Sequence, residues 1–359
     1  MSSTAPTPRD TPYLEVDLEV LERNLLLAAD DARARGVELR PHAKTHKSPE
    51  VGRRQLAHGA VGLSLATVSE AEIFADAGFD DIFIAYPVWP SARRTERIRG
   101  LADRVRLRLG VDSVESAERL GAALVKESVE VLVEVDSGHH RSGVAPADAG
   151  VVAVAAARAG LRVVGVFTFP GHAYAPDARE SAARDEALAL ARASESLEAQ
   201  AIDPVVRSGG STPSRGAIDA SVLTESRPGV YVFNDAQQLE LGSCAFADIA
   251  LTARATVVSR RGRDVIVDAG SKVLGADRAA WASGFGRVLG MPDARITALS
   301  EHHATVRIAD GDVPPQLGSE LSIVPNHVCN AVNLADELVV VRDGTVVGEW
   351  PVAARGANS

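Results

Sequence analysis

The chain has 359 residues, of which 46% are hydrophobic and 24% are charged. These proportions are typical of soluble globular proteins and exclude a disordered or fibrous chain. The formal net charge of −10 at pH 7 argues against a nucleic-acid partner, because binding to phosphate backbones requires a basic face.

The N-terminus and the cysteine content predict a cytoplasmic protein. The first residues, MSSTAPTPRDTPYLEVD, lack the cationic start and the apolar run of a signal peptide. No stretch of 18 apolar residues occurs, so we expect no membrane-spanning segment. With only two cysteines, Cys244 and Cys329, the sequence predicts no disulfide framework.

Short runs rich in Val, Ile and Leu recur along the first two thirds of the chain. Successive runs are about 20 to 40 residues apart, the length of a strand–helix repeat. Strands are expected at Glu38–Pro41, Gly62–Ala66, Asp81–Ala85, Val105–Leu109, Val129–Val135, Val163–Phe167, Pro204–Arg207 and Arg227–Phe233. Helices are expected at Ser69–Ala77, Val114–Leu124, Pro146–Ala159 and Ala182–Ala199. This alternation predicts an α/β fold with a TIM-type (β/α)8 barrel over residues 18–240; a doubly wound open sheet is the alternative.

After about residue 240 the pattern changes to short alternating runs separated by Gly, Asp and Pro. Strands are expected at Ile249–Ser259, Asp264–Asp268, Ala304–Ile308, Leu321–Val324, Glu337–Val341 and Thr345–Trp350. Arg342-Asp343-Gly344 lies between the last two runs and indicates a hairpin. The sequence therefore predicts a C-terminal antiparallel β domain over residues 241–359, to which residues 1–17 are assigned.

Lysine is rare in this chain. Of 38 basic residues only Lys44, Lys47, Lys126 and Lys272 are lysines. Arginine cannot replace lysine where a primary amine must lose its proton and attack a carbonyl group. Lys44 follows the first expected strand, at the end of the barrel where active sites form, so it is the candidate catalytic residue.

Polar segments follow the later expected strands. Glu134-Val-Asp-Ser-Gly-His-His-Arg-Ser-Gly143 follows the fifth, and Gly171-His-Ala-Tyr174 follows the sixth. In Gly209–Thr212, after the seventh, consecutive glycines let backbone N–H groups converge on an anion, although a plain turn is the alternative. An amine at one strand end and a phosphate site at another suit pyridoxal phosphate (PLP).

Five motifs occur in order: Pro-His-Ala-Lys-Thr-His-Lys, Glu-Val-Asp-Ser-Gly-His-His-Arg-Ser-Gly, Gly-Ser-Thr-Pro, Arg-Pro-Gly-Val-Tyr and Asn-His-Val-Cys. With these motifs the chain resembles the D-threonine aldolase/D-serine dehydratase family, whose barrel is that of alanine racemase (PLP fold type III). The resemblance extends from about Asp10 to Gly356. It implies that Lys44 carries PLP and that Arg141 faces the PLP 3-hydroxyl oxygen. Tyr174 is the candidate partner of the pyridine nitrogen, and the implied phosphate-binding residues are Gly209, Gly210, Ser211, Thr212, Gly229 and Tyr231.

His327 and Cys329 match the two metal ligands of that family. In an extended chain the side chains of residues i and i+2 point the same way, so one divalent ion can bind both. Plain packing is the alternative for an isolated His-x-Cys. Two protein ligands leave open positions for a substrate hydroxyl, and a thiolate with an imidazole favours zinc, with manganese as the alternative.

The resemblance implies a lyase that acts on a small D-amino acid with a β-hydroxyl group. If Lys44 removes the Cα proton, the hydroxyl leaves and the products are a 2-oxo acid and ammonia, as in D-serine dehydratase. If the hydroxyl is deprotonated instead, the Cα–Cβ bond breaks to give glycine and an aldehyde, as in D-threonine aldolase. Within the family His-x-Cys accompanies dehydratases, so elimination is favoured. Phe169, where many dehydratase-like members have His and some aldolases have Tyr, pulls slightly towards the aldolase, and His302 and Ala304 are further departures.

Two remoter alternatives are an amino-acid racemase and a non-catalytic PLP carrier. A racemase needs a second base, usually a tyrosine of the β domain, and none of Tyr13, Tyr86, Tyr174 and Tyr231 lies in the C-terminal part. Carriers with this barrel have a single domain. The relatives form homodimers, and we expect the same here; the sequence does not indicate which β-hydroxy amino acid is the substrate.

Overall fold

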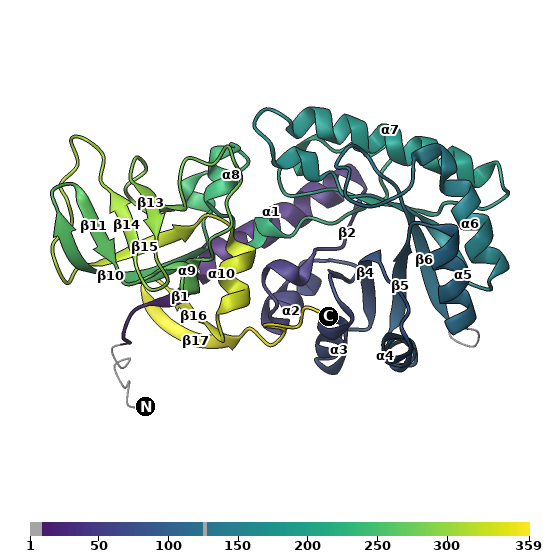
Figure 1. Ribbon diagram of the computed structural model, residues 1–359, viewed down its shortest axis with the longest axis horizontal. Coiled ribbons are helices and arrows are strands. Elements are labelled where there is room, and N and C mark those ends of the chain that lie inside the picture. The colour runs from purple at the N-terminus through teal and green to yellow at the C-terminus, as the bar shows by residue number, and fades with distance from the viewer. Residues whose placement is uncertain (1–8, 125–127) are drawn as a thin grey trace. The chain divides into compact units, whose positions relative to one another are not determined.

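The computed structural model describes residues 9–124 and 128–359 (Figure 1). Within these ranges the chain forms two compact units. The barrel unit comprises Leu27–Lys44, Val51–Gly229 and Ala357–Ser359, and the β unit comprises the described residues up to Leu26, Thr45–Glu50 and Val230–Gly356. The predicted domain boundaries after residues 17 and 240 stay a proposal, since compact units need not coincide with domains. No helix within the described ranges is long and apolar enough to cross a membrane.

The barrel unit contains eight parallel strands in one sheet. They are β2 (Glu38–Leu39), β3 (Leu63–Leu65), β4 (Asp81–Pro87), β5 (Arg106–Val111), β6 (Val129–Glu134), β7 (Arg162–Phe167), β8 (Val206–Gly209) and β9 (Glu225–Ser226). Their order is β2-β9-β8-β7-β6-β5-β4-β3. A bridge joins His42, which follows β2, to Ser64 in β3, and the N–H of Val61 donates to the carbonyl of Leu39 at 2.9 Å. The sheet therefore closes, which confirms the predicted barrel and excludes the open sheet.

The eighth strand was predicted at the wrong place. We expected Arg227–Phe233, but β9 is Glu225–Ser226, and Val230–Val232 form a 3-10 helix, η5. Pro228 has no N–H to donate to a neighbouring strand, so the ladder cannot continue through this apolar segment. The polar loop of this strand therefore begins at Arg227.

The described helices of the βα repeats are α1 (Leu18–Arg35), α2 (Pro49–Ala57), α3 (Val68–Asp76), α4 (Ala92–Ala102), α5 (Val114–Ala123), α6 (Ala149–Arg158) and α7 (Arg179–Glu198). The side chains of Thr67, Ser91 and Ser113 each accept a hydrogen bond from a first-turn N–H, so they begin α3, α4 and α5. In Figure 1 helices α5, α6 and α7 lie on the outside of the strands. A core cluster inside the barrel unit consists of Phe83, Leu132, Val164 and Phe167.

The β unit contains nine strands. They are β1 (Tyr13–Asp17), β10 (Leu251–Arg261), β11 (Asp264–Val267), β12 (Gly286–Val288), β13 (Arg295–Leu299), β14 (Ala304–Arg307), β15 (Glu320–Pro325), β16 (Glu337–Arg342) and β17 (Thr345–Pro351). All pairs are antiparallel except β1 with β16. Three short helices are α8 (Ala236–Glu240), α9 (Ser271–Leu274) and α10 (Val328–Leu334). The six predicted strands are present; β12 and β13 were not predicted.

Two local features of the β unit bear on the sequence analysis. The hairpin between β16 and β17 turns at Asp343 and Gly344, whose φ angles are 49° and 70°, which confirms the predicted turn. Tyr13 lies in β1 and Tyr231 in η5, so both belong to the β unit. Neither residue lies within 241–359, so the observation that the C-terminal part contains no tyrosine stands as the argument against a racemase.

Candidate functional site

A cavity of about 480 Å³ opens at the carboxyl ends of the barrel strands. In TIM-type barrels this end carries the active site, because the βα loops that follow the strands gather there. The lining residues include two of the predicted site residues, Lys44 and Arg141. The full lining is His42, Lys44, Ala66, Ala85, Tyr86, Pro87, Asp112, Arg141, Ser142, Phe169 and Arg227.

Phe169 is the residue around which three predicted PLP-binding side chains meet. The Lys44 Nζ lies 5.5 Å from the centroid of the Phe169 ring, and the Arg141 guanidinium carbon lies 5.2 Å from it. The Tyr174 ring packs against the same phenyl group, with a centroid separation of 6.2 Å. The barrel therefore brings Lys44, Arg141 and Tyr174 together, as the sequence predicts, but on an aromatic ring that cannot donate or accept a proton.

The turn that carries Lys44 is fixed by its own backbone. Lys44 lies in the 3-10 turn Ala43–Thr45, and its N–H donates to His42 Nδ1 at 3.3 Å. His46 is fully buried, and its Nδ1 lies 3.2 Å from the N–H and 3.0 Å from the carbonyl oxygen of Ser48. Of the two histidines that flank Lys44, His42 lines the cavity and His46 contacts its own loop.

Arg141 is backed by a buried carboxylate that the sequence analysis missed. Glu134 ends β6 and is 2% exposed; its Oε1 accepts from Ser142 Oγ at 3.0 Å and lies 3.7 Å from Arg141 Nη2. Its Oε2 is buried with no hydrogen-bond partner among the described residues. Burial raises the pKa of Glu134, and the Ser142 hydroxyl and the charge of Arg141 oppose that shift.

The predicted phosphate loop is built differently from the expected cradle. Gly210 has a φ of +82°, which favours glycine, and its N–H donates to Glu186 Oε1 at 2.6 Å rather than into the loop. The N–H of Ser211 donates to Ser214 Oγ at 3.1 Å. The prediction that these N–H groups all converge on one anion is therefore wrong for two of them.

The same loop nevertheless has features that fit an oxygen-rich anion. Ser226 Oγ is buried with no hydrogen-bond partner among the described residues, and a Cβ on Gly210 would collide with it. Ser208 pairs with Glu225 and Gly209 with Ser226, so the two predicted phosphate loops leave from adjacent strands. Gly229 ends one loop within the barrel unit, and Tyr231 is buried in η5 of the β unit. An unpartnered hydroxyl beside a glycine backbone is what a bound phosphate would require.

Glu186 lies beneath this loop, on α7, and is fully buried. Burial raises its pKa to about 7, against the opposing effects of the Gly210 N–H and of the charge of Arg227. The arginine itself is held by Ser208 Oγ, which accepts from its Nε at 2.7 Å, and by the carbonyl of Thr168. The carboxyl group therefore holds the glycine turn in place from the side of the helix.

The predicted metal ligands lie at the start of α10 in the β unit. His327 is the extended residue before the helix, whereas Cys329 lies in its first turn. The prediction of an extended chain through both residues is therefore wrong. Their side chains are nevertheless close enough for a hydrogen bond between them, and their role as metal ligands stays a prediction.

Three neighbours hold this pair. The His327 Nδ1 hydrogen bonds to Asp277 Oδ2, and the Cys329 Sγ lies 3.2 Å from Thr45 Oγ1. The N–H of Val328 donates to Asp235 Oδ2 at 3.1 Å. A carboxylate on one nitrogen of a histidine fixes the ring and leaves the other nitrogen for a metal. The described residues contain no group of three or more His, Cys, Asp and Glu placed to hold a metal. His327 and Cys329 supply an imidazole and a thiol, which are donor types that zinc takes in proteins.

Electrostatics at the pair favour a charged imidazole when no metal is present. Burial lowers the pKa of His327, but the charge of Cys329 and the hydrogen bond to Asp277 outweigh burial and raise the pKa to about 11. Burial raises the pKa of Asp235 to about 6, opposed by the charge of His327. A metal bound here would therefore displace protons as it binds.

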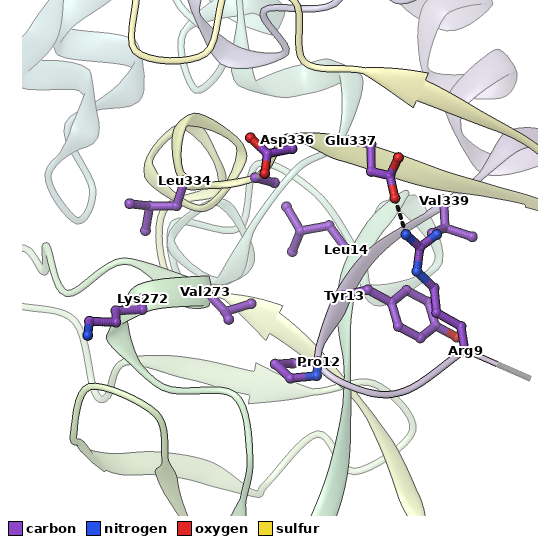
Figure 2. A pocket seen from close by; sticks show the side chains of 11 residues that line it. Arg9, Pro12, Tyr13, Leu14, Lys272, Val273, Leu334, Asp336, Glu337 and Val339 are labelled. Carbon is purple, nitrogen blue, oxygen red and sulfur yellow. Dashed lines mark hydrogen bonds and ion pairs between the residues drawn. The ribbon is translucent and has the colours of Figure 1, made fainter.

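A second cavity lies wholly within the β unit and is lined by none of the predicted site residues. Figure 2 shows Arg9 paired with Glu337 on one side and Lys272 on the other, its amine pointing away from the other labelled side chains. The Lys272 Nζ lies 2.7 Å from the carboxylate of Glu301. Lys272 therefore takes part in a half-exposed ion pair.

Two of the residues that the sequence analysis missed, Asp277 and Glu186, contact site residues that are far away in the sequence. Asp277 is 50 positions from His327, and Glu186 is 24 positions from Gly210. No spacing rule connects such pairs. Only Glu134, the first letter of the Glu-Val-Asp-Ser-Gly motif, stood inside a recognised pattern.

Comparison with known proteins adds two family matches. Residues 16–237 match the family described as "Alanine racemase, N-terminal domain". Residues 250–341 match a serine dehydratase domain family. Together they cover the barrel strands and most of the β unit.

Three characterised proteins are similar over nearly the whole chain. D-threo-3-hydroxyaspartate dehydratase of Delftia sp. strain HT23 is 36% identical over 349 residues, covering 89% of this chain and 91% of that enzyme. D-threonine aldolase of Arthrobacter sp. is 37% identical over 361 residues, covering 97% and 93%. The crystal structure of D-threonine aldolase from Filomicrobium marinum superposes with a TM-score of 0.87 at 34% identity, covering 97% of this chain and 96% of that one.

The Delftia dehydratase also provides a metal-related comparison. A structure of this enzyme with one cysteine replaced by alanine is described as the metal-free form, with a TM-score of 0.88 at 34% identity over 96% of this chain and 97% of that one. A second structure has a histidine replaced two positions earlier. His327 and Cys329 have the same spacing.

The fold is thus that of the type III PLP-dependent enzymes. Within that class, the chain belongs to the D-threonine aldolase/D-serine dehydratase family of PLP-dependent lyases.

Proposed function

We propose that this protein is a PLP- and divalent-metal-dependent lyase that eliminates water from a D-β-hydroxy amino acid, giving a 2-oxo acid and ammonia. The observation that carries this choice is the His327–Cys329 pair, whose spacing matches the two positions replaced in the Delftia dehydratase structures. Thiolate and imidazole ligands favour zinc, with manganese as the alternative.

The cofactor would be held by residues of the barrel unit. PLP supplies an electron sink for the charge that develops at Cα of the amino acid. The Lys44 amine would bind the cofactor, and its Nζ would remove the Cα proton. Arg141, beside Glu134, would face the 3-hydroxyl oxygen, and the hydroxyl of Tyr174 would face the pyridine nitrogen. The loops with Gly209, Gly210, Ser211, Thr212, Gly229 and Tyr231 would hold the phosphate, although the N–H groups of Gly210 and Ser211 donate within the protein.

The Phe169 side chain offers neither an acid nor a base. Its ring centroid lies 5.5 Å from the Lys44 Nζ and 5.2 Å from the Arg141 guanidinium carbon. The proposal therefore assigns proton transfer at Cα to Lys44 rather than to position 169. The His327 and Cys329 side chains orient the metal, whose Lewis acidity assists departure of the β-hydroxyl group.

D-threonine aldolase activity is the second candidate, because the Arthrobacter aldolase is as similar to this chain as the dehydratase is. In that reaction the β-hydroxyl loses its proton and the Cα–Cβ bond breaks, so Lys44 does not remove the Cα proton. We further propose that the protein is a cytoplasmic homodimer, as the family resemblance implies.

The deciding experiment is incubation of the purified protein with D-threonine, PLP and Zn²⁺, or Mn²⁺ in a parallel sample, with identification of the products. 2-Oxobutanoate and ammonia support the proposal. Glycine and acetaldehyde contradict elimination and establish the aldolase. The same assay with D-serine and D-threo-3-hydroxyaspartate tests other β-substituents, and absence of both product types from all three substrates contradicts both candidate functions.

A further inference from the structure

Thr45 occupies an unusual position in the chain. It is the residue directly after Lys44, in the same 3-10 turn, and it belongs to the β unit together with His327 and Cys329. Its side chain is fully buried. Its Oγ1 lies 3.2 Å from Cys329 Sγ, within the distance of a hydrogen bond to sulfur.

We propose that Thr45 is a positioning residue for the sulfur ligand of the metal, an inference that rests on the proposed function. The Cys329 sulfur and the Thr45 hydroxyl lie within hydrogen-bond distance of each other. With a divalent ion at the site the sulfur would be a thiolate, and the Thr45 hydroxyl would donate a hydrogen bond to it.

This arrangement complements the one at His327. Asp277 fixes the imidazole from one side, and the N–H of Val328, between the two ligands, is held by Asp235. Thr45 Oγ1 contacts the sulfur of the same pair. Outer-shell hydrogen bonds of this kind typically change metal affinity by about 10–100-fold.

The test compares Thr45→Val, which removes the hydroxyl with little change of shape, and Thr45→Ser, which keeps it. Zn²⁺ affinity of each full-length, PLP-loaded protein is measured by competition with a chromogenic chelator. We expect Thr45→Val to bind Zn²⁺ about 10-fold more weakly than wild type and Thr45→Ser to restore most of the affinity. Thr95→Val, which removes a buried hydroxyl from α4, should bind Zn²⁺ as wild type does.

A spectroscopic readout separates positioning from loss of structure. The absorption spectrum of the Co²⁺-loaded protein is recorded as a difference from that of the same PLP-loaded sample without metal. The thiolate-to-cobalt band is the band that disappears in Cys329→Ser. Removal of a hydrogen bond raises the energy of the sulfur lone pairs, so Thr45→Val should shift this band to longer wavelength, and Thr45→Ser should shift it back. If Thr45→Val does not fold, Thr45→Ala provides a second side chain without a hydroxyl.

Zn²⁺ affinity within about twofold of wild type, together with an unmoved cobalt band, overturns the proposal. A wild-type protein whose cobalt spectrum shows no band sensitive to Cys329→Ser overturns it as well. Failure of the proposed function has a different signature: the wild type binds metal through Cys329 but converts none of the three substrates. In that case the comparison of Thr45→Val with Thr45→Ser still decides the role of the hydroxyl.

Discussion

Glu225 Oε2 accepts hydrogen bonds from two buried arginines inside the barrel unit, from Arg40 Nε at 2.6 Å and from Arg108 Nη1 at 3.0 Å. Arg40 is also paired with Asp81 at 2.6 Å, and Arg108 with Glu130 at 2.9 Å. Burial alone would raise the pKa of Glu225, but the charges of Arg40 and Arg108 outweigh it and hold the pKa below its usual value. The barrel interior therefore contains a buried chain of alternating charges.

Glu225→Gln should destabilise the protein strongly. The substitution leaves two buried guanidinium groups with one fewer charge partner, and removal of one member of a buried ion pair costs about 3–5 kcal/mol. Urea unfolding measures the loss. Asp76→Asn is the control, because its pair with Arg104 is exposed and is worth less than about 1 kcal/mol. Equal losses for the two variants would contradict a structural role for the buried network.

Glu186→Gln should change how stability depends on pH. The unfolded carboxyl ionises near pH 4.3, whereas burial raises the pKa of native Glu186 to about 7. The native state therefore binds more protons between these values, so the contribution of Glu186 to stability is complete below about pH 4 and is lost as the pH rises to about 7. Glutamine does not titrate and can still accept from the Gly210 N–H.

Between pH 5 and pH 8 the unfolding free energy of wild type should therefore fall by about 3 kcal/mol relative to that of Glu186→Gln. Urea unfolding at unit steps of pH measures this difference. Glu180→Gln, an exposed position on the same helix, should follow the wild-type curve. Parallel curves for wild type and Glu186→Gln would show that the buried carboxyl does not titrate in this range.

Lys44→Ala should abolish both covalent attachment of PLP and activity. The amine is the group that binds the cofactor and moves the Cα proton in the proposed reaction, and loss of such a group lowers kcat/KM by at least about 10³-fold. Visible absorbance after dialysis reports attachment. Lys272→Ala removes an amine that pairs with Glu301 and should keep wild-type absorbance and activity. Absorbance retained by Lys44→Ala would assign the cofactor to another residue.

Cys329→Ala should lose the metal, whereas Cys244→Ala should keep it. Burial raises the pKa of Cys244 above its usual value, so this residue stays a thiol and is a poor metal ligand. The zinc content of each protein after dialysis measures the difference. Chelation should remove activity from the wild type and added Zn²⁺ should restore it, while the visible absorbance of PLP persists. An equal zinc content in the two variants would contradict the assignment of Cys329 as a ligand.

Hydrophobic periodicity was sufficient to predict the strands of the barrel and most strands of the β unit, because buried strands and amphipathic helices each have a local sequence pattern. Seven of the eight barrel strands were located to within a few residues. The eighth failed because apolar character continues through Arg227–Phe233, while backbone hydrogen bonding ends before Pro228. β12 and β13 were missed because β12 has three residues and β13 has an irregular register with its partner.

The predicted site residues lie in short motifs that contain several polar or reactive side chains. Lys44, Arg141 and Tyr174 stand at three different strand ends, and the barrel brings them to one phenyl ring. The groups that hold them in place are long-range partners, such as Glu186 beneath Gly210. Nothing in a single sequence marks a carboxylate as the partner of a glycine N–H two dozen positions away, because that contact depends on how a helix packs on a strand.

The place of β1 in its sheet has a consequence for synthesis of the protein. β1 lies between β10 and β16, and Glu15 pairs with Val339, which follows it by 324 positions. At about 5–20 residues per second the ribosome needs roughly 15 to 65 s to add these residues. Until β10 has been made, the first strand has neither of its neighbours, and the edge that pairs with β16 stays open for the whole of that time. The sheet of the β unit can therefore be completed only near the end of synthesis, even though its first strand is among the first segments to be made.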